Sequence, residues 1–501
     1  MGENIDELDA GKFTFDNTFA RLPERFYTRL APTPVSSPKV IKVNEQLAEI
    51  LGLDPEALGG RVGANILSGN CVPKGSEPLA MVYAGHQFGG WVPQLGDGRA
   101  ILLGEIVGRD DVRRDIQLKG AGPTPYSRSG DGRAALGPVL REYVLSEAMW
   151  RLGIATTRSL AAVDTGDTVL REEELPGAIV VRVAESHIRV GTFQFFSSRS
   201  DIVGLKALAD YVIERHFPSI DNEDGKYEAL LEEVVKRQAS LIAHWQLIGF
   251  IHGVMNTDNT SVVGETIDYG PCAFLDSYDP KKVFSSIDQF GRYAYSNQPG
   301  IGYWNIGCFG QTLLPLIEGG KKSALDRVQK IVAKYPELFR EAYLVGFRKK
   351  LGLRKQLDAD EILGQELLQE MAAEGLDYTE TFRHLTSYHG SNGARVAAAQ
   401  HFFGVSKGLK DWIARWSRRL EEDWVGSHGW ETVMGSANPV YIPRNHLVEE
   451  AIKYAVSEND YNYFHKLVGV LENPYEEVMS SAKYGLPPEP HEEVKATFCG
   501  T

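Results

Sequence analysis

Cysteine is scarce in this chain of 501 residues, which has only Cys71, Cys272, Cys308 and Cys499. None of them forms a CxxC pair, so the sequence has neither a zinc-site pattern nor the paired cysteines of a small disulfide-stabilised domain. No apolar run approaches the roughly 20 residues that a helix needs to cross a bilayer. The first residues are acidic and lack an apolar core, so we expect no leader peptide, no membrane association and a cytoplasmic location.

Positive charge is also in deficit. Lys and Arg number 53 against 67 Asp and Glu, which gives a formal net charge of -14. Because nucleic-acid binding depends on neutralising phosphates, this balance argues against a nucleic-acid partner. Any site for a polyanion must therefore be a local cluster of Arg and Lys.

The length and the 43% hydrophobic content are sufficient for two domains or one large two-lobed domain. Short runs of strand-forming residues in the first 200 residues predict strands at 100–107, 115–120, 159–166 and 178–184. One helix, from Gly137-Pro138 to Gly153, interrupts these strands.

Beyond Gly204 the pattern becomes helical. Apolar residues recur at helical spacing from Leu230 to Ile248, which predicts a long buried helix leading to His252. Further helices are expected over most of 320–420 and from about His446. We therefore predict an α+β, protein-kinase-like two-lobed fold, with a β-rich N-terminal lobe over 1–190 and a mainly helical C-terminal lobe over 191–501.

A glycine turn is the first candidate site element. Gly96 and Gly98 flank Asp97 between two strand-like runs, and Arg99 follows. Glycines let backbone amides approach a phosphate closely, and an adjacent Arg adds positive charge. The alternative is an ordinary β-hairpin closed by an Asp-Gly turn.

Lys119 ends an apolar strand-like run, and Glu142 shares a helix face with Leu145 and Met149. An inward-facing carboxylate needs a cation, and a strand Lys paired with a helix Glu is the arrangement that holds a kinase lysine on nucleotide phosphates. Alternatively, Glu142 pairs with Arg141, Arg151 or another surface base.

Two further elements carry polar groups that suit an anion. Asp131-Gly132 precedes the helix and offers a turn whose amides could face a phosphate, or else a plain loop before the helix. Arg182 alternates with apolar residues in a strand, and Arg189 follows it closely. A phosphate would explain both arginines, although two neighbouring arginines more often face solvent.

The segment from His252 to Gly270 is close to a kinase catalytic loop, H-x-D-x-x-x-x-N followed by D-x-G. Asn259 and Asp268 stand at the positions of the two magnesium ligands, and their amide and carboxylate oxygens suit that ion. The residues between them predict a short hairpin that places both groups side by side. Val254, however, occupies the position of the catalytic Asp.

Asp258 is the candidate to replace the missing base, because it precedes the Asn ligand and could accept a hydroxyl proton. The alternative is a carboxylate that caps the loop. His252 is expected to anchor the loop by hydrogen bonding. Each element alone is a weak signal, but the glycine turn, Lys, Glu, Asn and D-x-G occur in kinase order.

Three blocks of the sequence are long and distinctive: YAGHQFGGWVPQLGDGRA at 83–100, QLKGAGPTPYSRSGDGRAALGPVLREYVLSEAM at 117–149, and HGVMNTDN with TIDYGP. In these blocks, and over nearly its whole length, the chain resembles the selenoprotein O family. The resemblance implies a kinase-like fold and a protein adenylyltransferase that binds ATP in a flipped orientation and transfers AMP to Ser, Thr or Tyr hydroxyls of proteins. ATP and protein substrates would be its partners, and Mg²⁺, with Mn²⁺ as an alternative, its cofactor.

The resemblance also implies a role for each motif residue. Asp258 would be the proton acceptor, Asn259 and Asp268 would bind the metal, and Glu142 would position Lys119. The residues implied to contact ATP are Gly96, Gly98, Arg99, Lys119, Asp131, Gly132, Arg182, Arg189 and Asp268. Because many family members carry a redox-active residue near the C-terminus, the resemblance also implies a Cys272–Cys499 pair.

Two other functions remain open on the sequence alone. Because Val254 replaces the kinase Asp, the chain could be an ATP-binding pseudokinase scaffold without catalysis. It could also be an atypical phosphotransferase with Asp258 as its base. The sequence indicates no oligomeric state.

Overall fold

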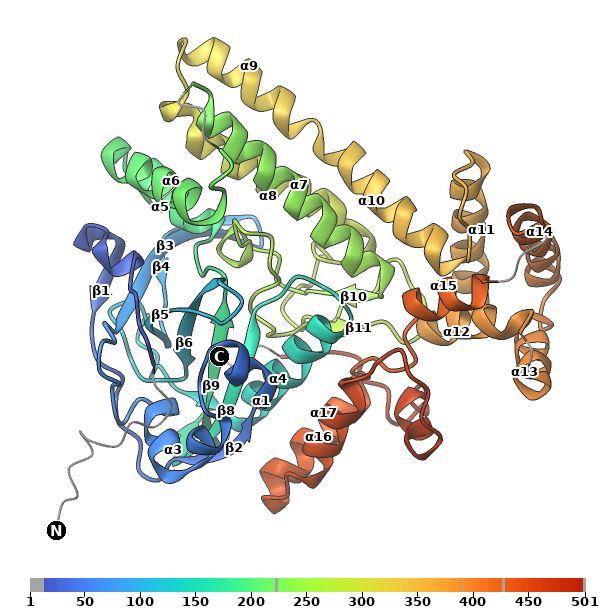
Figure 1. The fold of residues 1–501 in the computed structure, drawn as a ribbon, viewed down its shortest axis with the longest axis horizontal. Helices are drawn as coiled ribbons and strands as arrows, with labels where there is room; N and C mark the ends of the chain where they lie inside the picture. The colour runs from blue at the N-terminus through green and yellow to red at the C-terminus, as the bar shows by residue number, and fades with distance from the viewer. Residues whose placement is uncertain (1–12, 221–223, 391, 426–428, 499–501) are drawn as a thin grey trace.

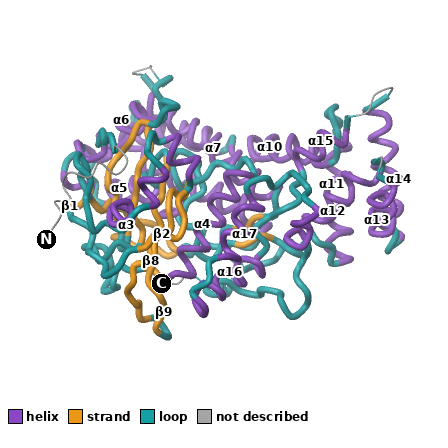
Figure 2. The backbone as a smooth tube through the Cα atoms, turned by 60° about the horizontal axis from the view of Figure 1, so that its bottom comes forward, coloured by secondary structure: helices purple, strands orange, loops and turns teal. Residues whose placement is uncertain are grey.

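The structure is a computed structural model that describes residues 13–220, 224–390, 392–425 and 429–498. Strands gather at one end of the molecule and helices extend to the other (Figures 1 and 2). No helix in these ranges is both long enough and apolar enough to cross a membrane.

An antiparallel sheet occupies the N-terminal region. Its order along the described chain is β1-β3-β5-β6-β9-β8-β2, with β4 added to β3 and β7 added to β9. The strands are β1 (Tyr27–Arg29), β2 (Lys39–Val43), β3 (Leu79–Gln87), β4 (Gly90–Gly96), β5 (Ala100–Val107), β6 (Arg113–Lys119), β7 (Ala134–Ala135), β8 (Arg158–Leu170) and β9 (Glu174–Ala184). The four strands predicted from the sequence are present as β5, β6, β8 and β9, because their apolar runs are buried on the two faces of this sheet.

Three short helices that the sequence analysis did not predict precede β3. They are α1 (Glu45–Ile50), α2 (Pro55–Gly59) and α3 (Arg61–Leu67). Their apolar residues, such as Leu47 and Leu58, share one core with Ile101, Ile116 and Val181 of the sheet. These helices have only five to seven residues, which is too short for a clear helical period in the sequence.

The predicted helix between the strands is α4 (Leu136–Arg151). It packs on β8 and β9 with one side and on the C-terminal helices α16 (Asn445–Glu458) and α17 (Asn462–Leu471) with another. Tyr143 of α4 meets Phe464 of α17 edge to face, with ring centroids 5.6 Å apart. The end of the chain therefore returns to cover a helix of the β-rich region.

Helices make up most of the chain after β9. They are α5 (Val190–Ser198), α6 (Ile202–His216), α7 (Lys226–Leu247), α8 (Gln298–Leu313), α9 (Lys321–Val332), α10 (Tyr335–Lys350), α11 (Ala359–Glu374), α12 (Tyr378–Tyr388), α13 (Gly393–Phe403), α14 (Lys407–Asp423) and α15 (Trp430–Ala437), followed by α16 and α17. A small ribbon, β10 (Phe250–Ile251) with β11 (Ala273–Phe274), follows α7.

The predicted long buried helix is α7, whose apolar stripe lies in the largest core cluster. The helices predicted over 320–420 and from about His446 are also present. The fold is thus mixed α+β, with an antiparallel β-rich N-terminal region and a helical C-terminal region. The two-lobed arrangement and the boundary at 190/191 stay predictions.

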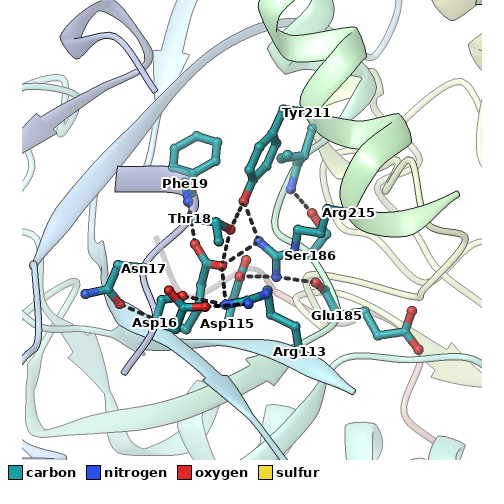
Figure 3. Close-up of polar contacts among 12 residues, drawn as sticks. Asp16, Asn17, Thr18, Phe19, Arg113, Asp115, Glu185, Ser186, Tyr211 and Arg215 are labelled. Carbon is teal, nitrogen blue, oxygen red and sulfur yellow. Dashed lines mark hydrogen bonds and ion pairs between the residues drawn. The ribbon is translucent and has the colours of Figure 1, made fainter. Parts of the chain in front are cut away.

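A buried charge network joins the two regions (Figure 3). Glu105 of β5 accepts a 2.6 Å hydrogen bond from the backbone N–H of Phe19. Arg215 of α6 donates to the carboxylate of Asp115 on β6 and to the backbone carbonyl of Glu185, both at 2.7 Å. Because Glu185 directly follows β9, this network holds the connection between the sheet and α5 in place.

Replacing Phe464 with Ala tests the packing of the C-terminal helices on α4. The side chain is fully buried, so we expect the free energy of unfolding to fall by about 3–5 kcal/mol in urea denaturation. Lys466→Ala, which changes an exposed residue of the same helix, is the control and should alter stability by less than about 0.5 kcal/mol. Equal effects of the two changes would contradict this packing.

Candidate active site

A cavity of about 600 Å³ lies beside β4, β6 and β9. All residues that the sequence analysis assigned to ATP, together with Asp258, line it: Gly96, Gly98, Arg99, Lys119, Asp131, Gly132, Arg182, Arg189, Asp258 and Asp268. Asn259, Glu142 and Cys272 are not among the lining residues. The fold therefore gathers these ten residues, which span 172 positions from Gly96 to Asp268, around one cavity.

Asp268 is the centre of this site, because three cations face its carboxylate. Arg189 donates to Oδ2 at 2.9 Å, Arg182 donates to Oδ1, and Lys119 Nζ lies 3.6 Å from Oδ1. Burial opposes ionisation of Asp268, but the arginines and Lys119 outweigh it and hold its pKa well below the usual value. Asp268 has a φ of 66°, which is uncommon for a residue other than glycine.

Glu142 supplies a second carboxylate from behind Lys119. Its Oε2 accepts a 2.7 Å hydrogen bond from Lys119 Nζ, and its Oε1 accepts one from Arg182. Burial disfavours its ionised form, yet Arg182 and Lys119 lower the pKa of Glu142 to about 2. Pairing with Arg141 or Arg151 is wrong, because Arg141 bonds to Glu449 and to a backbone carbonyl while Arg151 bonds to Gln46.

The strands explain why these charges converge. β6 and β9 are neighbours, and Lys119 pairs with Val180, two residues before Arg182. Both arginines are inside the protein, with Arg182 2% and Arg189 3% exposed. The alternative of solvent-facing arginines is therefore wrong.

The glycine turn is not an ordinary hairpin, because β4 pairs with β3 while β5 pairs with β3 and β6. Asp97 is buried and accepts hydrogen bonds from the backbone N–H of Met81 at 3.1 Å and from Gln117 Nε2 at 3.2 Å. A Cβ at Gly98 would lie 2.8 Å from the carbonyl oxygen of Tyr126. The turn is thus packed against the neighbouring loop, and glycine is needed for that close approach.

Asp131 pairs with Arg171 at 2.8 Å and accepts the backbone N–H of Arg133 at 2.9 Å. It does not cap α4, whose N-cap residue is Ala135. Arg171 lies on the turn between β8 and β9, so this pair joins two segments of the cavity rim.

Asp258 lies in the short 3₁₀ helix η4 (Thr257–Asn259) and is 5% exposed. Its Oδ2 accepts a 3.0 Å hydrogen bond from Gln87 Nε2, whereas its Oδ1 has no hydrogen-bond partner among the described residues. Burial raises the pKa of Asp258 to about 6. Because its side chain does not cap η4, the capping alternative is not supported. A buried, unpartnered oxygen of this kind calls for an explanation such as catalysis.

Asn259 is partly buried, and its Nδ2 donates to the carbonyl of Val254 at 3.0 Å. The hairpin predicted between Asn259 and Asp268 is wrong. Ser261 instead pairs with Arg189, and Thr266 pairs with Thr156. These residues find their partners in the N-terminal half of the chain, which short-range pattern alone does not reveal.

His252 anchors the loop as expected. It is buried, its Nε2 lies 2.9 Å from the carbonyl oxygen of Ile267, and its ring stacks on Trp245 with centroids 5.2 Å apart. Because Ile267 precedes Asp268, this bond fixes the start of the D-x-G segment relative to the loop.

Three or more His, Cys, Asp or Glu side chains arranged to hold a metal are not found within the described ranges. An Asn–Asp pair is a different set of donors, and metal binding by Asn259 and Asp268 stays a prediction. Cys272 is fully buried. Cys499 lies outside the described residues, so the Cys272–Cys499 pair stays a prediction. Thr497 Oγ1 donates to the carbonyl of Pro271 at 2.5 Å, which brings the segment before Cys499 close to the residue that precedes Cys272.

The sequence analysis did not assign several residues that line the cavity, among them Tyr83 and Gln87. Gln87 bonds to Asp258, and the ring of Tyr83 lies under the Arg189 guanidinium, 4.7 Å from it. Both belong to β3, where Tyr83 is the fifth residue and Gln87 the last, after an apolar run from Leu79 to Val82. A polar residue late in such a strand was the available signal.

Comparison with known proteins identifies the relatives of this chain. Residues 10–472 match a family model described as "Protein adenylyltransferase SelO". The chain belongs to the SelO family. Proteins named "Protein nucleotidyltransferase YdiU" are similar over nearly their full lengths: one from Rhizobium etli is 58% identical, covering 98% of this chain and 97% of the relative. Another from Rhizobium leguminosarum bv. trifolii is 57% identical over the whole of both chains. A third, from Bradyrhizobium diazoefficiens, is 55% identical over 98% of this chain and 99% of the relative.

The predicted family membership is thus confirmed, and with it the prediction that this chain is a nucleotidyltransferase enzyme. The family and the named relatives indicate nucleotidyl transfer, which agrees with a cavity lined by seven cationic side chains, three of which face Asp268. Such an activity uses a nucleoside triphosphate and usually a divalent metal.

Glu142→Gln tests the charge balance of the site. Since the pKa of Glu142 is lowered from 4.5 to about 2, its ionised form stabilises the fold above pH 4.5, and this contribution disappears as the pH falls toward 2. We expect the variant to lose about 3 kcal/mol of unfolding free energy at pH 7 in urea denaturation. The deficit should be unchanged at pH 5.5 and smaller at pH 3.5.

The control for this measurement is Glu172→Gln, which changes an exposed residue of the turn between β8 and β9. Its stability should follow that of the unchanged protein at every pH. A deficit of Glu142→Gln that stays constant down to pH 3.5 would show that packing, not charge, is lost.

Proposed function

We propose that this chain is a protein adenylyltransferase that transfers AMP from ATP to Ser, Thr or Tyr hydroxyls of proteins, requires Mg²⁺ and releases pyrophosphate. The observation that carries the proposal is a buried Asp258 with one unpartnered oxygen, in the same cavity as three cations that converge on Asp268. A kinase-like two-lobed arrangement, with the β-rich lobe supplying Lys119 and the helical lobe supplying Asp268, belongs to the same proposal.

The cations account for the choice of leaving group. AMP transfer breaks the bond between the α-phosphorus and the bridging oxygen, so that charge develops on pyrophosphate. Three cations that line the cavity would bind that charge: Lys119, Arg182 and Arg189. Arg99 also lines the cavity and adds positive charge. ATP in a flipped orientation would place its terminal phosphates on these cations and its α-phosphorus toward the acceptor hydroxyl.

Asp258 supplies the proton acceptor. The acceptor oxygen forms a bond to the α-phosphorus, its proton passes to the carboxylate of Asp258, and pyrophosphate leaves with the electron pair of the broken bond. Val254, at the usual position of a kinase base, is apolar and 6% exposed, so it cannot take this role.

Asn259 and Asp268 would hold the metal. Their amide and carboxylate oxygens are the hard donors that Mg²⁺ prefers, and Mn²⁺ accepts the same set. When bound, the ion would neutralise phosphate charge. Asp268 already faces three cations, so ATP and the metal together would redistribute these pairings.

ATP labelled separately at the α and γ positions distinguishes the candidate activities. We expect the α label, and not the γ label, to enter the soluble proteins of a cell extract after incubation with the enzyme, ATP and Mg²⁺, because AMP is the transferred group. Gel autoradiography measures the entry of each label into protein, and intact-protein mass spectrometry measures the mass of the group that is added. Entry of the γ label alone would establish a phosphotransferase, and entry of neither a scaffold.

Asp268→Asn separates binding from transfer. Asn tolerates a positive φ, so the backbone is retained, while the charge that would hold the metal is lost. We expect the transfer rate to fall at least 100-fold, whereas ATP binding without metal is kept or tightened because three cations lose an anionic partner. Lys119→Ala should instead weaken both.

Titration with a fluorescent ATP analogue and the α-label assay measure these two quantities. Asp326→Asn, at an exposed position on α9, is the matched control and should leave both unchanged. Full transfer by Asp268→Asn would place the catalytic site elsewhere.

A further inference from the structure

The turn between β3 and β4 lies against the loop that carries Asp258, and backbone hydrogen bonds fix it there. The N–H of His86 donates to Thr257 Oγ1 at 2.7 Å, and the N–H of Phe88 donates to Asn256 Oδ1 at 3.0 Å. The residues on either side of Gln87, one at the end of β3 and one in the turn, are thus bound to the two residues that precede Asp258. The residue between them, Gln87, has little freedom to move relative to the loop.

The loop itself does not supply a side-chain donor to the Asp258 carboxylate. Thr257 Oγ1 donates to Gln194 Oε1 at 2.7 Å, and Asn259 Nδ2 donates to the carbonyl of Val254 at 3.0 Å. The donor comes from the β-rich region instead, as Gln87 Nε2 at 3.0 Å from Oδ2. Both Gln87 and Asp258 line the cavity, so the contact lies where an acceptor must approach.

Gly85 confines the other oxygen. A Cβ at this position would lie 2.7 Å from Asp258 Oδ1 and 3.0 Å from Asp258 Cβ. The carboxylate is therefore held between a hydrogen-bond donor on one side and a bare backbone on the other. Among the described residues, the Gln87 hydrogen bond is therefore the side-chain contact that sets the orientation of the carboxylate.

We propose that Gln87 is a positioning residue for AMP transfer: its amide binds Oδ2 of Asp258, orients the carboxylate from the β3–β4 turn and leaves Oδ1 for the acceptor hydroxyl. This inference rests on the proposed function. Its physical basis is that a buried carboxylate with a single donor turns freely once that donor is removed, and a misoriented base transfers protons slowly. Because the Gln87 amide is bonded to Asp258 and not to Lys119, Arg182 or Arg189, we expect ATP binding to change little.

Gln87→Met and Gln87→Lys test the proposal. Met keeps the length of the side chain without a donor, whereas Lys keeps a donor. With the α-label assay on cell-extract proteins, we expect Gln87→Met to lower the rate at saturating ATP about 10- to 100-fold and Gln87→Lys to retain most of the activity. The apparent KM for ATP should change less than about twofold in both. Gln94→Met, at an exposed position on β4, is the control and should match the unchanged protein.

A double-mutant cycle with Asp258→Asn measures whether the effect of Gln87→Met on the transfer rate depends on the Asp258 carboxylate. This dependence separates a positioning role from a purely structural one. If Gln87 acts through Asp258, Gln87→Met has no further effect in the Asp258→Asn background. Additive losses, a raised KM for ATP, or an active Gln87→Met would overturn the positioning role. Full activity of Asp258→Asn would instead refute the base assignment in the proposed function, so the two failures are distinguishable.

Discussion

The convergence of three cations on Asp268 is the interaction on which the site depends. Lys119, Arg182 and Arg189 carry three positive charges, while Asp268 and Glu142 carry two negative ones. These five side chains are largely buried, and removing a charge from water costs free energy. The attraction between the two carboxylates and the three cations offsets part of that cost. Asp97, whose Oδ1 lies 3.9 Å from Arg189 Nη2, faces the third positive charge. The further arginines that line the cavity, such as Arg99, still leave cations in excess over carboxylates, and a polyphosphate is a natural partner for that excess.

The scaffold around this centre explains its rigidity. Lys119 and Arg182 stand on neighbouring strands, Glu142 on the helix that packs over them, and Arg189 at the start of α5. Several of these elements are held by contacts far from the cavity, including the Arg215 network behind the sheet. The relative positions of these charges thus depend on packing over much of the chain.

Much of this arrangement could be predicted because it follows local patterns. Apolar runs marked the strands, helical periodicity marked α7, and motif order marked the residues of the cavity, from Gly96 to Asp268. The predictions that failed concern residues whose structural partners lie far away in the sequence. The predicted hairpin after Asn259 does not form because Ser261 and Thr266 pair with Arg189 and Thr156. Gln87 was marked only as a polar residue at the end of an apolar strand, and that pattern does not indicate the loop that it contacts some 170 residues later.

The return of α16 and α17 to α4 has a consequence for biosynthesis. A ribosome releases Leu140 and Val144 some 300 residues before Leu447 and Phe464, which cover the same apolar surface. During that interval the apolar surface of α4 is not covered by α16 and α17. Exposed apolar surface of this kind makes nascent chains prone to aggregation and dependent on chaperones. A transcript cut short before codon 445 would therefore yield a polypeptide holding every cavity residue yet lacking the cover for the helix behind Lys119.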